Sequence, residues 1–250
     1  MWVEKQKRAS HLFRACARAA SEVAAETLWP TRCAACGSLG NVLCESCRAD
    51  LPYIDQWKAC PVCGAPFGLL QCTECNTYSL KEHGRSHVPY TQCVSAVLFA
   101  GSSPAIARTR KDGGERRLAG PMAYAIACAI PPSWVTPGSI VTFVPSTRRA
   151  ARERGFCHAH ELALEVARYL ALPCEKLLRV SDAADQRHLS RSQRMRNASG
   201  RFAALPSAQA TRIILVDDVY TTGSTAMAAA DALSSAGCTS VNVATFARVM

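Results

Sequence analysis

The chain has 250 residues, of which 49% are hydrophobic and 19% are charged, a balance that supports a packed core and excludes wholesale disorder. Lys and Arg outnumber Asp and Glu by 29 to 19, so the formal net charge is +10. The longest uninterrupted apolar stretch, from Met122 to Ile130, is far shorter than the ~20 residues that a membrane-spanning helix needs. We therefore expect no membrane span.

Residues 1–28 are predicted to form an amphipathic, alanine-rich helix with a basic start. This segment lacks the continuous apolar core of a secretory signal, which argues against export. Without export, an extracellular disulfide framework loses its usual setting. We therefore expect a cytoplasmic protein whose fourteen cysteines have another purpose.

Eight of these cysteines form four C-x-x-C pairs in the predicted second segment, residues 29–80. The pairs are Cys33/Cys36, Cys44/Cys47, Cys60/Cys63 and Cys72/Cys75. Two such turns complete a tetrahedral four-cysteine zinc site. Structural zinc supplies roughly 10–16 kcal/mol of binding energy to a segment that has few large apolar side chains to bury. The pattern predicts two structural zinc sites, paired in chain order because the gaps are short, with interleaved pairing still open.

A redox role for the C-x-x-C pairs is the weaker alternative, because the redox motif normally stands alone beside a βαβ unit. The six isolated cysteines are expected to be mostly small buried hydrophobic residues. A polar stretch at residues 81–86 is predicted to be a linker to the last domain, residues 88–250.

In this last domain, short apolar runs alternate with helical patterns. The predicted strands are Val94–Ala100, Ile140–Val144, Leu177–Val180, Ile213–Val216 and Val241–Phe246, and the predicted helices are Gly120–Ile130, His158–Leu170 and Ser224–Ala236. Strands that alternate with helices indicate an α/β fold with a parallel sheet. Ligands bind such sheets at the carboxyl ends of the strands.

A phosphate-binding pattern follows the strand predicted at Ile213–Val216. Its residues are Asp217, Asp218, Thr221, Thr222, Gly223, Ser224 and Thr225. Backbone N–H groups at a helix start bind phosphate, and neighbouring carboxylates can accept hydrogen bonds from sugar hydroxyls or position a divalent cation. The pattern therefore predicts a ribose 5-phosphate site, and the alternative is a capped helix with two solvated acids.

The string from Leu215 to Thr225 resembles the phosphoribosyl pyrophosphate signature of type I phosphoribosyltransferases. The resemblance implies that Asp217 and Asp218 bind the ribose 2′- and 3′-hydroxyls. It also implies that the loop from Thr221 to Thr225 wraps the 5-phosphate, and that magnesium enters with the pyrophosphate of the substrate.

Further segments resemble the ComF/GntX family. They are Val144-Pro145 followed by Arg154-Gly155-Phe156, the stretch from Gln186 to Phe202, and Trp29-Pro30 with the cysteine pairs. This resemblance runs from about residue 28 to the C-terminus. It implies a parallel-sheet type I phosphoribosyltransferase fold preceded by a small cysteine-rich double zinc ribbon.

Basic residues after the Ile140–Val144 strand are expected where a pyrophosphate would lie. Arg149, Arg152 and Arg154 suit this task because a guanidinium binds phosphate oxygens bidentately, although a solvated helix start would look the same. Lys111 resembles the family's Lys-containing turn in the first loop after a strand, and it is either a substrate contact or simply exposed. The polar stretch 182–201 is predicted to close over the site.

One pair of residues departs from the family pattern. After R-G-F the family usually has Asn-Gln, whereas this chain has Cys157-His158. This change puts the polar contacts at the helix start in doubt. A Cys/His nucleophile is disfavoured because adjacent helical residues do not face each other.

The resemblance implies a ComF-like phosphoribosyltransferase connected with competence, DNA uptake and natural transformation. Its acceptor and catalytic residues stay unassigned, and so does the question of activity. The alternative is a non-catalytic component of the competence machinery that binds single-stranded DNA or docks a helicase-like protein. Few aromatic residues of the zinc segment are expected at the surface for base stacking, namely Tyr53, Trp57 and Phe67.

Overall fold

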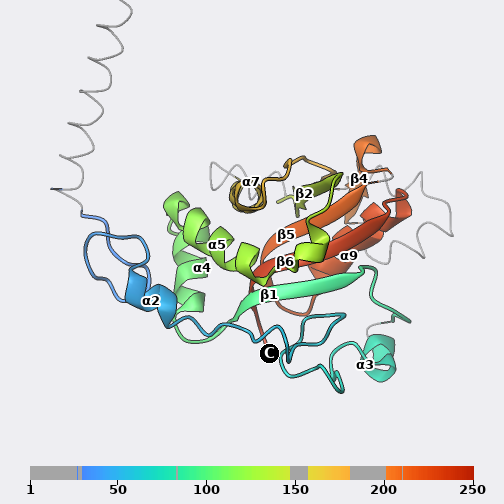
Figure 1. The fold of residues 1–250 in the computed structure, drawn as a ribbon, viewed down its shortest axis with the longest axis horizontal. Helices are drawn as coiled ribbons and strands as arrows, with labels where there is room; N and C mark the ends of the chain where they lie inside the picture. The colour runs from blue at the N-terminus through green and yellow to red at the C-terminus, as the bar shows by residue number, and fades with distance from the viewer. Residues whose placement is uncertain (1–26, 28–29, 83, 147–156, 181–200, 210) are drawn as a thin grey trace, which may run out of the picture.

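The computed structural model describes residues 27, 30–82, 84–146, 157–180, 201–209 and 211–250. Its centre is a parallel sheet with the strand order β1-β6-β5-β2 (Figure 1). The strands are β1 (Gln92–Leu98), β2 (Ser139–Phe143), β5 (Arg212–Tyr220) and β6 (Ser240–Arg248). The predicted parallel α/β sheet is therefore confirmed. Apart from Thr27, the predicted N-terminal helix at 1–28 lies outside the described residues.

Helices cover both faces of this sheet. They are α4 (Ser103–Lys111), α5 (Ala119–Ala129), α7 (His158–Leu170) and α9 (Ser224–Ser235), with short 3-10 turns at η1 (Arg116–Leu118), η2 (Pro132–Trp134) and η4 (Pro206–Ala208). Along β5, Ile214 and Val216 belong to the hydrophobic cluster that contains the α5 and α7 side chains, whereas Ile213 and Leu215 join the α9 cluster. This alternation follows the two-residue period of a strand.

The sequence prediction missed α4 and misplaced one strand. The stretch predicted at Leu177–Val180 does not join the parallel sheet. It forms β3 (Leu178–Val180), which pairs antiparallel with β4 (Phe202–Ala204) in a separate two-stranded sheet. This small sheet packs against α9. A strand of only three residues does not carry its pairing partner in its own sequence, so only the tertiary fold decides this placement.

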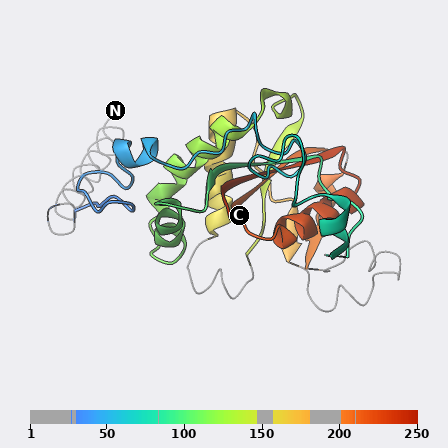
Figure 2. The ribbon, with the colours of Figure 1, turned by 90° about the horizontal axis from the view of Figure 1, so that it is seen from below.

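The cysteine segment forms two separate ribbons, the first beside α2 at one end of the described structure and the second next to β1, toward α3 (Figures 1 and 2). The first ribbon ends in α2 (Glu45–Ala49), and Cys33, Leu43 and Leu51 belong to the same core cluster as α5. The second ribbon is followed by α3 (Thr77–Glu82). Among the described residues, none of the helices combines the length and apolar character that crossing a bilayer requires.

The chain between the ribbons runs along the open edge of β1. The Ile54 N–H donates to the Ala96 carbonyl at 3.0 Å, and the Leu98 N–H donates to the Pro52 carbonyl at 2.9 Å. These bonds use backbone groups of an edge strand that would otherwise stay unpaired. The zinc segment is thus hydrogen-bonded to the sheet.

The predicted linker at 81–86 is not a free polar connection. Its first two residues, Lys81 and Glu82, end α3. The Arg85 guanidinium forms a largely buried ion pair with Asp231 of α9 at 2.7 Å. This pair fixes the start of the last domain against its own helix, because both charges would be costly to bury alone.

Candidate functional site

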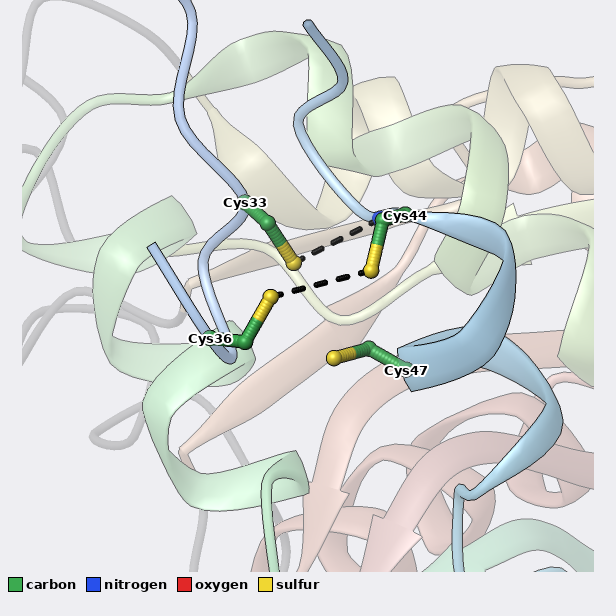
Figure 3. Close-up of side chains that lie close together, drawn as sticks. All are labelled: Cys33, Cys36, Cys44 and Cys47. Atoms are coloured by element: carbon green, nitrogen blue, oxygen red, sulfur yellow. Dashed lines mark hydrogen bonds between the residues drawn. The ribbon is translucent and has the colours of Figure 1, made fainter. Parts of the chain in front are cut away.

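The eight paired cysteines gather into two sets of four. One set is Cys33, Cys36, Cys44 and Cys47, the other is Cys60, Cys63, Cys72 and Cys75, and within each set the sulfur atoms lie within 4.8 Å of one another. Figure 3 shows the four thiols of the first set pointing toward a common centre. The sets follow chain order, as the short gaps between the pairs favour.

The sulfur spacing fits tetrahedral zinc. At a Zn–S distance of ~2.3 Å, neighbouring sulfurs of a tetrahedron lie ~3.8 Å apart. The Cys36 and Cys44 sulfurs are separated by 3.7 Å, and the Cys60 and Cys75 sulfurs by 3.6 Å. Two four-cysteine zinc ribbons are therefore present, and each donor set is closed, which suits a structural metal.

The turns around the thiols support metal binding by thiolates. The Cys44 N–H points at the Cys33 sulfur at 3.4 Å, and hydrogen bonds, first from the Ser46 hydroxyl and then from Cys47, lower the pKa of Cys44 to about 6. A glycine follows the second cysteine in two of the pairs, and both glycines have positive φ, +75° at Gly37 and +72° at Gly64. At Gly64, an added Cβ would also lie only 2.5 Å from the Cys93 carbonyl oxygen of β1, so the second ribbon packs there without room for a side chain.

The isolated cysteines differ from the prediction. Cys93 is buried, but Cys128 is exposed, and Cys157, Cys174 and Cys238 are only partly buried. All described cysteines are free of disulfides.

The paired acids lie inside β5 rather than in a loop after it. The sequence analysis ended the strand at Val216, but β6 continues the ladder to Tyr220, which pairs with Arg248. The Asp217 carboxylate accepts from the Asp218 N–H at 2.9 Å. Burial, followed by the charge of Asp218, raises the pKa of Asp217 well above its usual value. The ionised pair is consequently costly unless a hydroxyl donor or a cation approaches it.

Two basic groups from other elements face Asp218. The Lys111 ammonium and the His158 Nε2 each lie 3.7 Å from the Asp218 Oδ2 atom. Lys111 is the last residue of α4. The prediction that it lies in the first loop after a strand is therefore wrong, because α4 stands between β1 and this residue. His158 and Cys157 contact different partners, because the Cys157 sulfur receives the Ser146 hydroxyl at 3.6 Å.

A buried arginine binds the first turn of α7. Arg110 is 1% exposed, and its guanidinium donates to the His158 carbonyl at 2.5 Å and lies 3.9 Å from Glu161. Arg110 was not predicted as part of the site, because the helix α4 that carries it was not predicted either. A correct helical assignment for 103–111 would have placed Arg110 next to the buried positions Ile106 and Ala107.

The predicted phosphate loop turns directly into α9. Gly223 has a φ of +73° and precedes the helix, and its carbonyl accepts the Met227 N–H at 2.8 Å. The Thr222 hydroxyl bonds Ser224 at 3.1 Å, and the Arg201 guanidinium donates to the Thr225 hydroxyl at 3.3 Å. A small hollow lined by Asp217, Thr221, Gly223, Thr225 and Thr245 joins this loop to the first of the two acids.

The structure thus brings eight of the predicted substrate-site residues to one edge of the sheet. These residues are Lys111, Asp217, Asp218, Thr221, Thr222, Gly223, Ser224 and Thr225. Arg149, Arg152 and Arg154, together with nearly all of the 182–201 stretch, lie outside the described residues. Their placement at a pyrophosphate stays a prediction.

Comparison with known protein families gives two matches on this chain. A double zinc ribbon domain matches residues 24–78, and a phosphoribosyl transferase domain matches residues 158–250. Both matches agree with the four-cysteine sets and with the parallel sheet. The chain is therefore a double zinc ribbon protein with a phosphoribosyltransferase domain.

The curated relatives are bacterial. The chain is 26% identical to DNA utilization protein YhgH of Escherichia coli O157:H7 over 80% of its own length and 94% of that protein. It is 36% identical to DNA utilization protein YhgH of Salmonella typhi, over 43% of this chain and 48% of that protein. The chain is therefore homologous to DNA utilization protein YhgH, and its double zinc ribbon followed by a phosphoribosyltransferase domain agrees with the resemblance to the ComF/GntX family.

Solved structures give a looser likeness. An allosteric regulatory enzyme of purine biosynthesis is 18% identical with a TM-score of 0.34, over 51% of this chain and 26% of that chain. Glutamine phosphoribosylpyrophosphate amidotransferase from B. subtilis is 22% identical with a TM-score of 0.35, over 51% of this chain and 25% of that chain. The aligned part is about a quarter of each of these larger chains.

Proposed function

We propose that this protein binds phosphoribosyl pyrophosphate with magnesium at the carboxyl ends of β5 and β2. The observation that carries the proposal is the continuous arrangement of Asp217 and Asp218, the turn at Gly223 and the first residues of α9. Carboxylates, hydroxyls and the N–H groups of a helix start meet there within one segment of chain. A ribose 5-phosphate offers hydroxyl donors to the first group and an anion to the last.

The charge pattern of the site supports a ligand with both features. Asp217 carries a pKa raised by burial and by its neighbour, and sugar hydroxyls that donate to the pair would stabilise its ionised form. Lys111 stands 3.7 Å from Asp218 and limits the negative charge at the ligand's edge. Magnesium would arrive with the pyrophosphate and supply charge neutralisation for this leaving group.

In a transfer reaction, the bond between the anomeric carbon and the pyrophosphate oxygen breaks through an oxocarbenium-like state, and the pyrophosphate keeps the bonding electrons. The protein's part is to hold the 5-phosphate on the Gly223 loop and the hydroxyls on the acid pair, so that the sugar stays fixed while pyrophosphate leaves. An acceptor nucleophile then bonds to the same carbon. Its identity is not set by these residues.

Isothermal titration with phosphoribosyl pyrophosphate and magnesium tests this proposal on zinc-replete protein. We expect saturable binding that Asp217→Asn together with Asp218→Asn weakens about 100-fold or more. Asp50→Asn, at the exposed end of α2, serves as the matched control and should bind like the wild type. Absence of binding by the wild type would refute the proposal.

A second candidate function is single-stranded DNA binding through the zinc ribbons, as part of the DNA uptake role that the family resemblance implies. Trp57, Phe67 and Tyr78 are 88%, 72% and 73% exposed, so base stacking is sterically open. Against this role, residues 30–80 hold three basic and four acidic side chains, and each four-thiolate zinc site adds a net negative charge. We therefore place any DNA contact second to the sugar-phosphate site.

The two candidates respond differently to salt and to substitution. DNA bound through phosphates weakens steeply as salt rises, and Trp57→Ala should remove a stacking contact. The acid-pair variant should leave such binding unchanged. We propose a reducing, cytoplasmic setting for either role, because the eight zinc-site thiols must stay reduced to bind metal.

A further inference from the structure

Arg248 is the last residue of β6 and has no exposed surface. A guanidinium stays charged in proteins, so complete burial is costly unless its donors find partners. Within the strand ladder, Arg248 lies beside Leu98 of β1 and Tyr220 of β5. Its partners therefore connect two parts of the molecule. One is the sheet edge that holds the candidate site, and the other is the chain segment that packs against β1.

On one side, these partners belong to the second zinc ribbon. Nη1 donates to the Cys63 carbonyl at 2.8 Å, and Nη2 forms an ion pair with Glu74. Nη2 also lies 3.9 Å from the Cys63 sulfur. Cys63 is a zinc ligand, and Glu74 stands between the ligands Cys72 and Cys75. The ribbon thus offers its two partners to Arg248 from both of its cysteine turns.

On the other side, Arg248 stacks on the residue under the phosphate loop. Its guanidinium carbon lies 4.1 Å from the centre of the Tyr220 ring. The Tyr220 hydroxyl forms a buried hydrogen bond with Tyr90 at 2.9 Å. A Cβ added at Gly223 would lie 2.1 Å from that hydroxyl. The Tyr220 ring therefore packs directly against Gly223 of the loop.

We propose that Arg248 is a positioning residue that couples zinc in the second ribbon to phosphate binding at the Gly223 loop. When zinc holds both cysteine turns, Cys63 and Glu74 bind the two terminal nitrogens of the guanidinium, which then fixes the Tyr220 ring. When the turns separate, the buried charge loses both partners and must move, and the ring no longer supports the loop. The inference rests on the proposed function, since it concerns the same 5-phosphate site.

Coupling between two binding sites is reciprocal. A ligand that carries a 5-phosphate should therefore raise the zinc affinity of the second ribbon by the same factor as zinc raises the ligand affinity, and we expect zinc loss to slow as a result. The first ribbon provides the internal comparison. In the described part of the chain, its contacts run to α5 and to Arg117, which bonds Thr31 at 2.9 Å, and they do not involve Tyr220.

The test compares the affinities of two probes, ribose 5-phosphate and magnesium pyrophosphate, in zinc-replete protein. Glu74→Gln keeps the shape of a partly exposed side chain but removes the charge that faces Arg248. We expect ribose 5-phosphate affinity to fall about 5- to 10-fold, roughly the net worth of one ordinary hydrogen bond, and pyrophosphate affinity to stay within about twofold of the wild type. Glu45→Gln, at an exposed acid of the first ribbon, is the matched control and should change neither.

Two further variants separate positioning from folding. Arg248→Met retains the apolar stem but loses the donors, and we expect it to lower ribose 5-phosphate affinity more than Glu74→Gln does. Arg248→Lys keeps the charge and should recover part of that loss. Zinc release to a colorimetric chelator should slow for one of the two ions when ribose 5-phosphate is present, and this protection should disappear in Glu74→Gln.

The outcomes distinguish the coupling from the proposed function. Wild-type binding of ribose 5-phosphate with unchanged affinity in Glu74→Gln and Arg248→Met would overturn the coupling alone. Equal losses for ribose 5-phosphate and pyrophosphate would also overturn it, because Arg248 would then only support the fold. A wild type that binds neither probe would overturn the coupling, and the proposed function fails as well if phosphoribosyl pyrophosphate with magnesium does not bind.

Discussion

The two zinc ribbons have the same four-cysteine chemistry but different relations to the rest of the molecule. The first ribbon contacts the domain through apolar side chains such as Leu43 and Leu51, beside α5. The second ribbon is held by backbone and charge, through the Val62 carbonyl that accepts from Cys93 at 2.8 Å and through the buried Arg248. The same four-cysteine motif therefore has two structural roles. The first ribbon is a peripheral module, and the second ribbon is an integral part of the domain that carries the site.

The largest expected effect is the loss of thermal stability when one ribbon loses its zinc. Cys72→Ser should lose one zinc per chain and lower the melting temperature by ~10 °C or more, because a structural site contributes several kcal/mol. Cys36→Ser, at the exposed cysteine of the first set, should lose one zinc with a smaller fall. Metal analysis and thermal unfolding of both variants measure this. Equal falls would contradict the difference between the ribbons.

The next effect concerns the acid pair. Asp217→Asn together with Asp218→Asn should weaken phosphoribosyl pyrophosphate binding about 100-fold or more, because several charged hydrogen bonds are lost at once. Both zinc ions should stay bound, since neither aspartate contacts a cysteine set. Calorimetry paired with metal analysis checks the two halves of this expectation. A variant that loses zinc as well would show that the site and the ribbons are not separable in this way.

Gly223→Ala should have an intermediate effect. The residue has positive φ, and a Cβ would lie 2.1 Å from the Tyr220 hydroxyl, so strain of about 1–3 kcal/mol is expected in the loop. This corresponds to roughly a 10- to 100-fold weaker grip on a 5-phosphate. Gly138→Ala is the matched control, since Gly138 also has positive φ, +83°, but nothing lies within 4 Å of the added Cβ.

Affinity titrations with ribose 5-phosphate separate these two glycines. Gly138→Ala should lose some stability but no affinity. If both variants bind as the wild type does, the loop does not hold the phosphate.

The smallest effect is a pH dependence of stability. The folded-state pKa of Asp217 is raised, first by burial and then by Asp218, so the folded protein holds this proton more tightly than the unfolded chain does. Its contribution to stability is complete below the unfolded pKa of about 4 and is lost as the pH rises through the folded-state pKa. Asp217→Asn should therefore melt a few degrees higher than the wild type near pH 8, and no higher near pH 3. A gain of equal size at both pH values would contradict this cause.

Much of this organisation could be predicted from local sequence, for physical reasons. Cysteine spacing reflects the reach of a metal turn, so both zinc sets follow from residues that lie close in the chain. Asp217, Asp218 and Gly223 stand in one string, and the buried strand before them has an apolar run that is easily recognised. These features need no knowledge of the tertiary fold.

The rest depends on contacts between distant parts of the chain. Glu74 and Arg248 are 174 residues apart, and nothing in either neighbourhood marks the pair. The predicted end of β5 was Val216, but the strand continues to Tyr220 because β6 pairs with it that far. This pairing cannot be read from the sequence of β5 alone. His158 was noted as a departure from the family pattern, but its approach to Asp218 required the packing of α7 against the sheet.

The most direct test of the account is a calorimetric titration of zinc-replete wild-type protein with phosphoribosyl pyrophosphate and magnesium. The account predicts saturable binding at one site per chain, which disappears in the variant with Asp217→Asn and Asp218→Asn while both zinc ions remain. No binding by the wild type, or binding that survives in this variant, would contradict it.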